Sequence, residues 1–194
     1  MHKTDCFVII GFGSLLWDLD VLESHVTGGW HYYSGPNLPL EFSLISKKRQ
    51  QALALVIDCE WGVECPTSVI ISKRVNVSEV VFDLAKREQT LAENIGFFQR
   101  DSDFARSRSK FVLGCVKNWL AGTQWVGAVW TDSPSNFKEK TQVGFSVPAA
   151  LEYLQSLPNS SLIEAKRYIE NAPDRVDTPL RRALAADSWW KSLT

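Results

Sequence analysis

The chain has 194 residues, of which 45% are hydrophobic, so its length favours one domain with a full core. Its 21 basic and 22 acidic residues give a net charge of -1, and we expect no nucleic-acid partner because phosphate-backbone binding needs a basic excess. The apolar stretch over residues 7–17 is too short to span a bilayer, so we expect a soluble cytoplasmic protein with no membrane contact.

Five short apolar or alternating runs predict β-strands in the first two thirds of the chain. They lie at residues 6–10, 40–46, 52–58, 67–74 and 125–132. The four cysteines are scattered and lack the spacing of a zinc site or of a disulfide scaffold. We therefore expect reduced and mostly buried thiols.

Between residues 76 and 96 the hydrophobic period changes from two to 3.6, which predicts an amphipathic helix. Asn76 or Ser78 is the expected N-cap, and Gly96 is the expected end. The residues expected on the buried face are Val77, Val81, Leu84, Leu91 and Ile95.

Further helices are predicted at 110–120, ending at Gly122, and at three places in the C-terminal third. The expected start signals there are Ser146 with Pro148, a capping box of Ser161 and Glu164, and Thr178 with Pro179. Strands come first and helices are inserted and appended, so we expect an α+β fold with a mixed, barrel-like sheet. We expect a single domain over 1–194, with the core over 1–132 and a helical C-terminal extension over 133–194.

A glycine-containing loop, Gly11-Phe12-Gly13-Ser14, follows the first predicted strand. It lacks the third glycine of a dinucleotide-binding turn and the lysine of a phosphate-binding loop. Its backbone N–H groups could bind a carboxylate or an oxyanion, and a tight turn needed only for packing is the alternative. Ser14 is not expected to be a nucleophile, because its flanking residues do not form a nucleophile elbow and no histidine base can be placed.

Glu88 lies near the middle of the apolar face predicted for the helix at 76–96, whereas the charged neighbours Asp83 and Arg87 are expected to face solvent. A carboxylate turned toward a core must be paired or must become neutral, and such burial can produce a general base. A buried ion pair or a shifted helix register are the structural alternatives. Glu41 and Glu64, which lie in apolar strand contexts, are the competing candidates for the base.

Three segments together resemble the γ-glutamylcyclotransferase-like family. GFGSLLW at residues 11–17 is similar to the Tyr-Gly-Ser loop of that family, and its continuation is most similar to the ChaC type, which acts on glutathione. EWGVE at residues 60–64 resembles the family's Trp-Gly-Val strand. DLAKREQT at residues 83–90 resembles its Arg-Glu segment, in which the glutamate is the catalytic acid/base.

The resemblance implies an α+β fold with a small mixed β-barrel of about five to seven strands surrounded by helices. It implies an enzyme that cleaves a γ-glutamyl amide to 5-oxoproline, by attack of the α-amine on its own γ-carbonyl. It places Glu88 as the general acid/base, and it places the substrate at Gly13, Ser14 and Leu15 in the loop that begins with Gly11 and Phe12. It implies a small γ-glutamyl substrate as the partner, with no metal and no cofactor, and leaves the oligomeric state open.

The chain departs from the family at three positions of these segments. Phe12 stands where the family has tyrosine, Ala85 stands where aspartate is common, and a helical pattern rather than a glycine-containing turn follows Glu88. The missing tyrosine and the altered segment after Glu88 support an alternative function: a non-catalytic protein on the same fold that binds a small ligand or serves as an interaction module.

Overall fold

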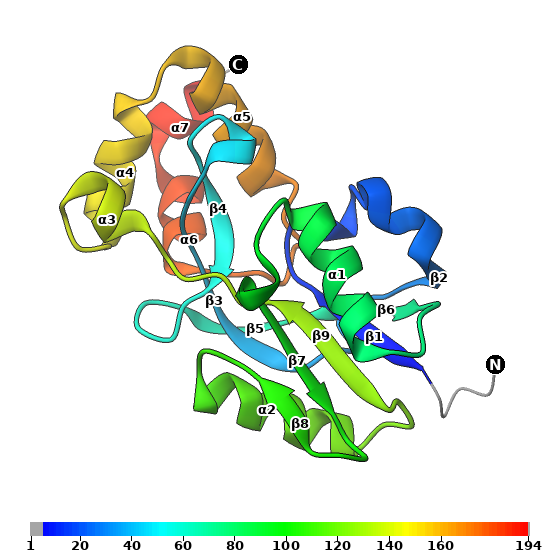
Figure 1. Ribbon diagram of the computed structural model, residues 1–194. Helices are drawn as coiled ribbons and strands as arrows, with labels where there is room; N and C mark the ends of the chain where they lie inside the picture. Colours follow the sequence, from blue (N-terminus) through cyan, green and yellow to red (C-terminus); the bar gives the residue numbers. More distant parts are fainter. Residues whose placement is uncertain (1–5, 194) are drawn as a thin grey trace. The chain divides into compact units, whose positions relative to one another are not determined.

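The computed structural model describes residues 6–193 and shows an α+β fold, as the sequence predicts. The residues cluster into two compact units, whose helices and strands are labelled in Figure 1. Unit 1 holds the described residues up to Leu38 together with Pro66–Ser133, and unit 2 holds Pro39–Cys65 and the described residues from Pro134 onward. The single domain expected from the sequence, with a core over 1–132, stays a prediction.

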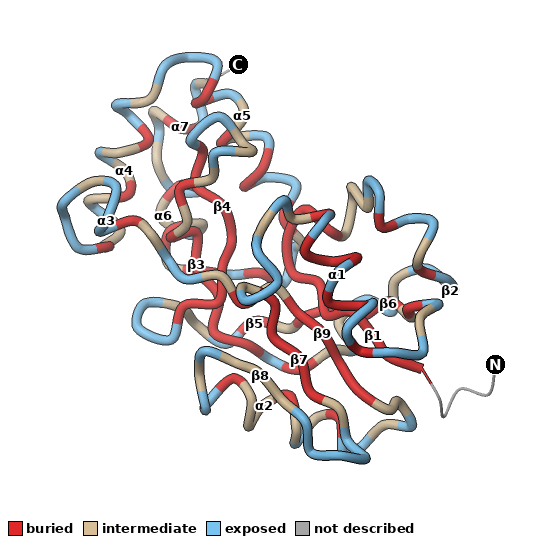
Figure 2. The backbone as a smooth tube through the Cα atoms, in the orientation of Figure 1, coloured by how far each residue is buried: buried red, intermediate tan, exposed pale blue. Residues whose placement is uncertain are grey.

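Unit 1 is built on a six-stranded mixed sheet with the strand order β2-β6-β1-β9-β7-β8. At its centre β1 pairs with β9 in parallel and with β6 in antiparallel orientation. These central strands are buried along their length, as expected of strands covered on both faces (Figure 2). The bounds of the strands are β1 Phe7–Gly11, β2 Val26–His31, β6 Ser68–Ser72, β7 Ile95–Gln99, β8 Phe104–Arg106 and β9 Gly127–Thr131.

The sheet is covered on one face by helix α1 (Val77–Glu88). Alternate residues of the central strands, such as Ile9 and Val129, pack against Val80 and Leu84 of the helix in one buried apolar cluster. The side chain of Asn76 accepts a hydrogen bond from the Ser78 amide, which confirms the predicted N-cap. Helix α2 (Lys110–Ala121), with its C-cap at Gly122, also lies as predicted and contacts β7 and β9.

The helix predicted over residues 76–96 was too long. Gln89 adopts a left-handed conformation with φ 54°, and the Thr90 and Gln89 amides donate to Ala85 and Lys86 carbonyls in the paired arrangement of a Schellman motif. The chain then forms a short 3-10 turn, Ala92–Asn94, and strand β7. Leu91, expected on the buried face, is therefore 66% exposed, whereas Ile95 is buried as a strand residue.

Four strands were missed, namely β2, β7, β8 and β5 (Val63–Pro66). Strand β2 contains Gly28 and Gly29 at φ 80° and 71°, and its register with β6 shifts around them. Glycine inside a strand often marks a bulge, and here the two glycines interrupt the alternation of residues by which a strand is identified. The first two residues of β7, Ile95 and Gly96, were assigned to the preceding helix because Ile95 extends the helical period.

Unit 2 contains a three-stranded sheet with the order β4-β3-β5 and all the helices after residue 133. Its strands are β5, β3 (Asn37–Ser46) and β4 (Ala52–Ile57). Helix α5 (Asn159–Glu170) packs on β4. The helices are α3 Phe137–Thr141, α4 Val147–Ser156, α5 Asn159–Glu170, α6 Pro179–Ala186 and α7 Ser188–Ser192.

The helix starts of unit 2 test the capping signals read from the sequence. Ser146 caps α4 and Thr178 caps α6, as predicted. The predicted capping box of Ser161 and Glu164 is wrong, because α5 begins after Pro158 and Ser161 is buried inside the helix. Glu164 instead forms ion pairs with Arg49 and Arg167.

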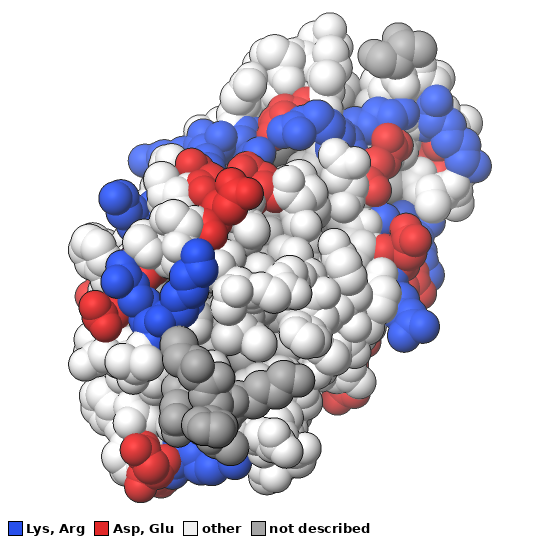
Figure 3. Space-filling model, turned by 90° about the vertical axis from the view of Figure 1, so that its right-hand side faces the viewer, with Lys and Arg blue, Asp and Glu red and all other residues white. Residues whose placement is uncertain are grey.

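The cysteines were expected to be mostly buried, and the surface to carry balanced charges. Cys6 and Cys65 are buried, Cys115 is partly buried and Cys59 is exposed. On the face that Figure 3 shows, basic and acidic side chains lie next to one another, in keeping with the net charge of -1. Within residues 6–193 no helix is both long enough and apolar enough to cross a membrane.

Candidate functional site

The glycine loop begins where β1 ends, at Gly11. A Cβ atom at this position would clash with the ring of Trp30 and would press on a methyl group of Leu16. Trp30 comes from β2 and packs against the same apolar cluster as α1. The loop therefore needs a glycine here because an indole ring crosses the backbone.

A 3-10 turn, η2 (Ser14–Leu16), follows Gly13. The Leu16 amide donates to the Gly13 carbonyl at 3.0 Å, so the amides of Ser14 and Leu15 precede the first hydrogen bond of the turn. The side chains of Phe12 and Leu15 are 7% and 5% exposed, and that of Leu15 belongs to the core of unit 1. The groups that this loop can offer to a ligand are thus its backbone amides and the Ser14 hydroxyl.

Arg87 connects this loop to helix α1. Its side chain is 1% exposed, and Nη2 donates to the Ser14 hydroxyl at 3.2 Å and to the Asp18 carbonyl oxygen. Its Nη1 donates to Oε1 of Glu88 at 2.8 Å. One guanidinium therefore contacts both Ser14 of the glycine loop and Glu88, two residues that are 74 positions apart in the sequence.

Glu88 is the last residue of α1, and its side chain is 20% exposed. The prediction that it lies in the buried face of the helix was wrong. The buried charged residues of the helix are Asp83 and Arg87, which were expected to face solvent. A negative charge at the C-terminal end of a helix opposes the helix dipole, and the ion pair with Arg87 offsets that repulsion.

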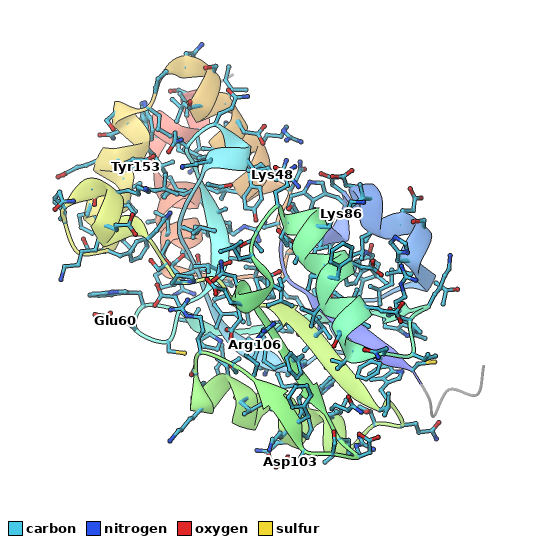
Figure 4. All side chains as sticks on the ribbon, viewed as in Figure 1. Lys48, Glu60, Lys86, Asp103, Arg106 and Tyr153 are labelled. Carbon is cyan, nitrogen blue, oxygen red and sulfur yellow. The ribbon has the colours of Figure 1, made fainter. Side chains whose placement is uncertain are left out.

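The phase of helix α1 explains why Arg87 is buried and Glu88 is not. Val80 is fully buried, and Asp83, Leu84 and Arg87 continue its face at spacings of three and four residues. Asp83 can be buried because the Arg74 guanidinium donates to its carboxylate at 2.7 Å. Figure 4 labels Lys86 on α1; this side chain is exposed, whereas that of the next residue, Arg87, is buried.

Arg87 is the functional candidate that sequence reasoning missed. The available signal was Val80: a face drawn through Val80 and Leu84 passes through position 87 rather than 88. The face predicted from Val77, Val81 and Leu84 is rotated about the helix axis by a fraction of a turn from the face through Val80 and Leu84. A pattern of apolar residues alone cannot show that the buried charge has partners on another segment.

Glu41 and Glu64, the other candidates for the general base, both lie in unit 2. Glu41 is fully buried, and its two oxygens accept hydrogen bonds from the Phe42 amide at 2.8 Å and the Leu180 amide at 3.3 Å. Burial raises its pKa, an effect opposed by hydrogen bonds from Thr178 and the two amides. Glu64 is exposed. Glu41 therefore joins β3 to the start of α6 and presents no surface to a ligand.

A second buried carboxyl of unit 1, Asp132, follows β9. It accepts hydrogen bonds from the Arg108 amide at 2.7 Å and the Ser107 hydroxyl at 3.1 Å, and it is 4% exposed. Burial raises its pKa, and these hydrogen bonds act in the opposite direction. Its partners hold the segment that leads into α2, so we assign it a structural role.

Comparisons with protein-family models, with curated proteins and with solved structures find no match for this chain. Within residues 6–193, no three histidine, cysteine, aspartate or glutamate side chains form a group that could hold a metal ion. The residues predicted for substrate and catalysis, Gly11 to Leu15 and Glu88, all lie in unit 1.

Proposed function

We propose that this protein is a γ-glutamylcyclotransferase-like enzyme that converts a γ-glutamyl amide, either a peptide or an amine derivative, to 5-oxoproline and the free amine. The observation that carries the proposal is the shared contact of Ser14 and Glu88 with the guanidinium of Arg87. The loop and the Arg-Glu segment, each of which resembles that family, therefore meet at one place in unit 1.

The reaction needs two kinds of group, and we assign them to Glu88 and to the glycine loop. The α-amine of the substrate must lose a proton as its nitrogen attacks the γ-carbonyl carbon, and the leaving nitrogen must gain one as the amide bond breaks. Glu88 is 20% exposed, so its carboxylate can accept the first proton and return it to the leaving amine. No water is consumed, and the proton count of the protein is unchanged over the cycle.

The glycine loop supplies the second kind of group. The amides of Ser14 and Leu15 lie before the first hydrogen bond of the 3-10 turn, so they can donate to the substrate carboxylate or to the oxyanion that forms during attack. Either contact would help to hold the γ-glutamyl group folded for attack on its own carbonyl. As part of the same proposal, the strands would form the small mixed barrel of that family.

The test is release of 5-oxoproline from glutathione, γ-glutamylalanine and a γ-glutamyl anilide. We expect Glu88→Gln to lower kcat by about 100-fold or more, because positioned proton transfer contributes roughly 10²–10⁴-fold. Glu79→Gln is the matched control, since Glu79 lies on the same helix, 52% exposed, and does not contact Arg87. Wild-type turnover by Glu88→Gln would remove Glu88 from the mechanism.

Binding without turnover would support the alternative function. If the wild type binds a γ-glutamyl compound in calorimetry but releases no 5-oxoproline, the protein is a small-ligand-binding member of the fold. Phe12, which replaces the family's tyrosine and is 7% exposed, is the feature that favours this alternative, because no hydroxyl is present at that position.

A further inference from the structure

The two oxygens of the Glu88 carboxylate have different surroundings. Oε1 accepts the hydrogen bond from Arg87 Nη1 at 2.8 Å, whereas Oε2 has no hydrogen-bond donor among residues 6–193. A carboxylate held through one oxygen presents the lone pairs of the other in a defined direction. Oε2 is therefore the oxygen that remains available to a ligand.

The contact between Arg87 and Glu88 is not one that a helix forms by itself. Side chains of consecutive helical residues leave the axis in directions about 100° apart, so they do not face each other. The guanidinium that Arg87 turns toward Glu88 is at the same time held by the Ser14 hydroxyl and the Asp18 carbonyl, which both accept from Nη2. The Asp18 carboxylate lies 4.0 Å from Nη2 and adds an electrostatic contribution.

Arginine suits this task better than lysine. Its planar guanidinium has five N–H donors in a fixed arrangement, so Nη1 and Nη2 can serve Glu88 and the loop at the same time. A lysine keeps the charge but concentrates it on one nitrogen. The burial of Arg87, 1% exposed, shows that the group is enclosed and that its direction is set by the surrounding protein.

We propose that Arg87 is a positioning residue that directs Oε2 of Glu88 toward the substrate and makes the orientation of Glu88 depend on the Ser14–Asp18 loop. The inference rests on the proposed function. In the reaction, an N–H bond of the substrate amine breaks and an O–H bond forms at Oε2. The same proton then moves from Oε2 to the leaving nitrogen, while Oε1 keeps its hydrogen bond to Arg87.

The test is a double-variant cycle on kcat with the panel compound that the wild type converts fastest. We expect Arg87→Lys to lower kcat by about 10–100-fold, since small misplacements of a catalytic group cost rates of that order, and to change KM less. In the Glu88→Gln background the same change should have no further effect on the residual rate, because Arg87 acts through Glu88. Arg74→Lys is the control: Arg74 precedes α1 and pairs with Asp83, a buried residue of that helix, and this variant should keep the wild-type kcat.

Ser14→Ala provides a second variant if Arg87→Lys does not fold. It removes one acceptor that holds Nη2 and leaves the loop amides in place. We expect a smaller fall in kcat that is likewise absent in the Glu88→Gln background. Equal rate losses in both backgrounds, for whichever variant folds, would overturn the positioning role. A wild type that releases no 5-oxoproline from any compound would instead overturn the proposed function.

Discussion

At the residue scale, two glycines of unit 1 lie in opposite surroundings. At Gly11 a Cβ atom would clash with the Trp30 ring, whereas at Gly114, in the middle of α2, a Cβ atom would meet no atom within 4 Å. We expect Gly11→Ala to destabilise the protein by about 1–3 kcal/mol through overpacking. We expect Gly114→Ala to stabilise it by about 0.5–1 kcal/mol, because alanine favours the helix. Denaturant unfolding measures both changes. If the two variants changed the free energy of unfolding in the same direction and by the same amount, this account would be contradicted.

Asp132 gives the stability of the protein a specific dependence on pH. Because burial raises its pKa in the folded state above the ordinary value of 3.8, the folded state binds more protons over the interval between the two values. The stabilising contribution is present below the unfolded pKa and is lost as pH rises through the folded pKa. The wild type should therefore lose thermal stability relative to Asp132→Asn as pH rises above the ordinary value of 3.8 and through the raised pKa.

The control for this pH dependence is the exposed Asp101. Asp101→Asn should leave the difference in Tm from the wild type nearly constant over the same interval. If the difference between the wild type and Asp132→Asn were also constant, the buried carboxyl would not be linked to folding in the expected direction.

At the element scale, the end of α1 depends on a residue in a costly conformation. Gln89 has φ 54°, and the left-handed region costs a residue with a side chain about 1–2 kcal/mol. We expect Gln89→Gly to raise the free energy of unfolding by about 0.5–1 kcal/mol, since glycine is the usual residue at this position of a Schellman motif. Gln89→Ala is the matched control and should give no such gain, because alanine has the same steric conflict.

Local sequence predicts the start of α1 and part of its buried face, but not its end. Asn76 and the face through Leu84 follow from capping and periodicity, which depend on neighbouring residues alone. Whether the helix ends at Glu88 or continues depends on the burial of Ile95 in a strand that pairs with β9. Strand pairing is a long-range interaction, and the helical period of the same residues gives no indication of it.

At the scale of the whole molecule, unit 2 is formed by segments that are far apart in the chain. Glu41 of β3 accepts a hydrogen bond from the Leu180 amide, 139 residues away, at the start of α6. Thr178, the fully buried N-cap of α6, also interacts with this carboxylate. The C-terminal helices therefore share a core with β3 and β4, and they are not an appendage to a finished domain.

This arrangement predicts unequal costs for two N-cap substitutions. Ser146→Ala, which removes the cap of α4, should cost about 1 kcal/mol. Thr178→Ala should cost about 1–3 kcal/mol more, because a buried carboxylate also loses a hydrogen-bond donor. Denaturant unfolding of the two variants provides the comparison, and equal losses would show that the contact between Thr178 and Glu41 does not stabilise unit 2.

The sequence by itself determined the α+β class, the positions of most strands, the caps at Asn76, Ser146 and Thr178, and the candidate residues Ser14 and Glu88. Each of these follows from periodicity, local hydrogen bonding or a short motif. Only the tertiary structure decided that Arg87 rather than Glu88 is buried and that it joins the helix to the glycine loop. The physical reason is that a charge can be buried only where partners neutralise it, and those partners come from segments that only the fold brings together.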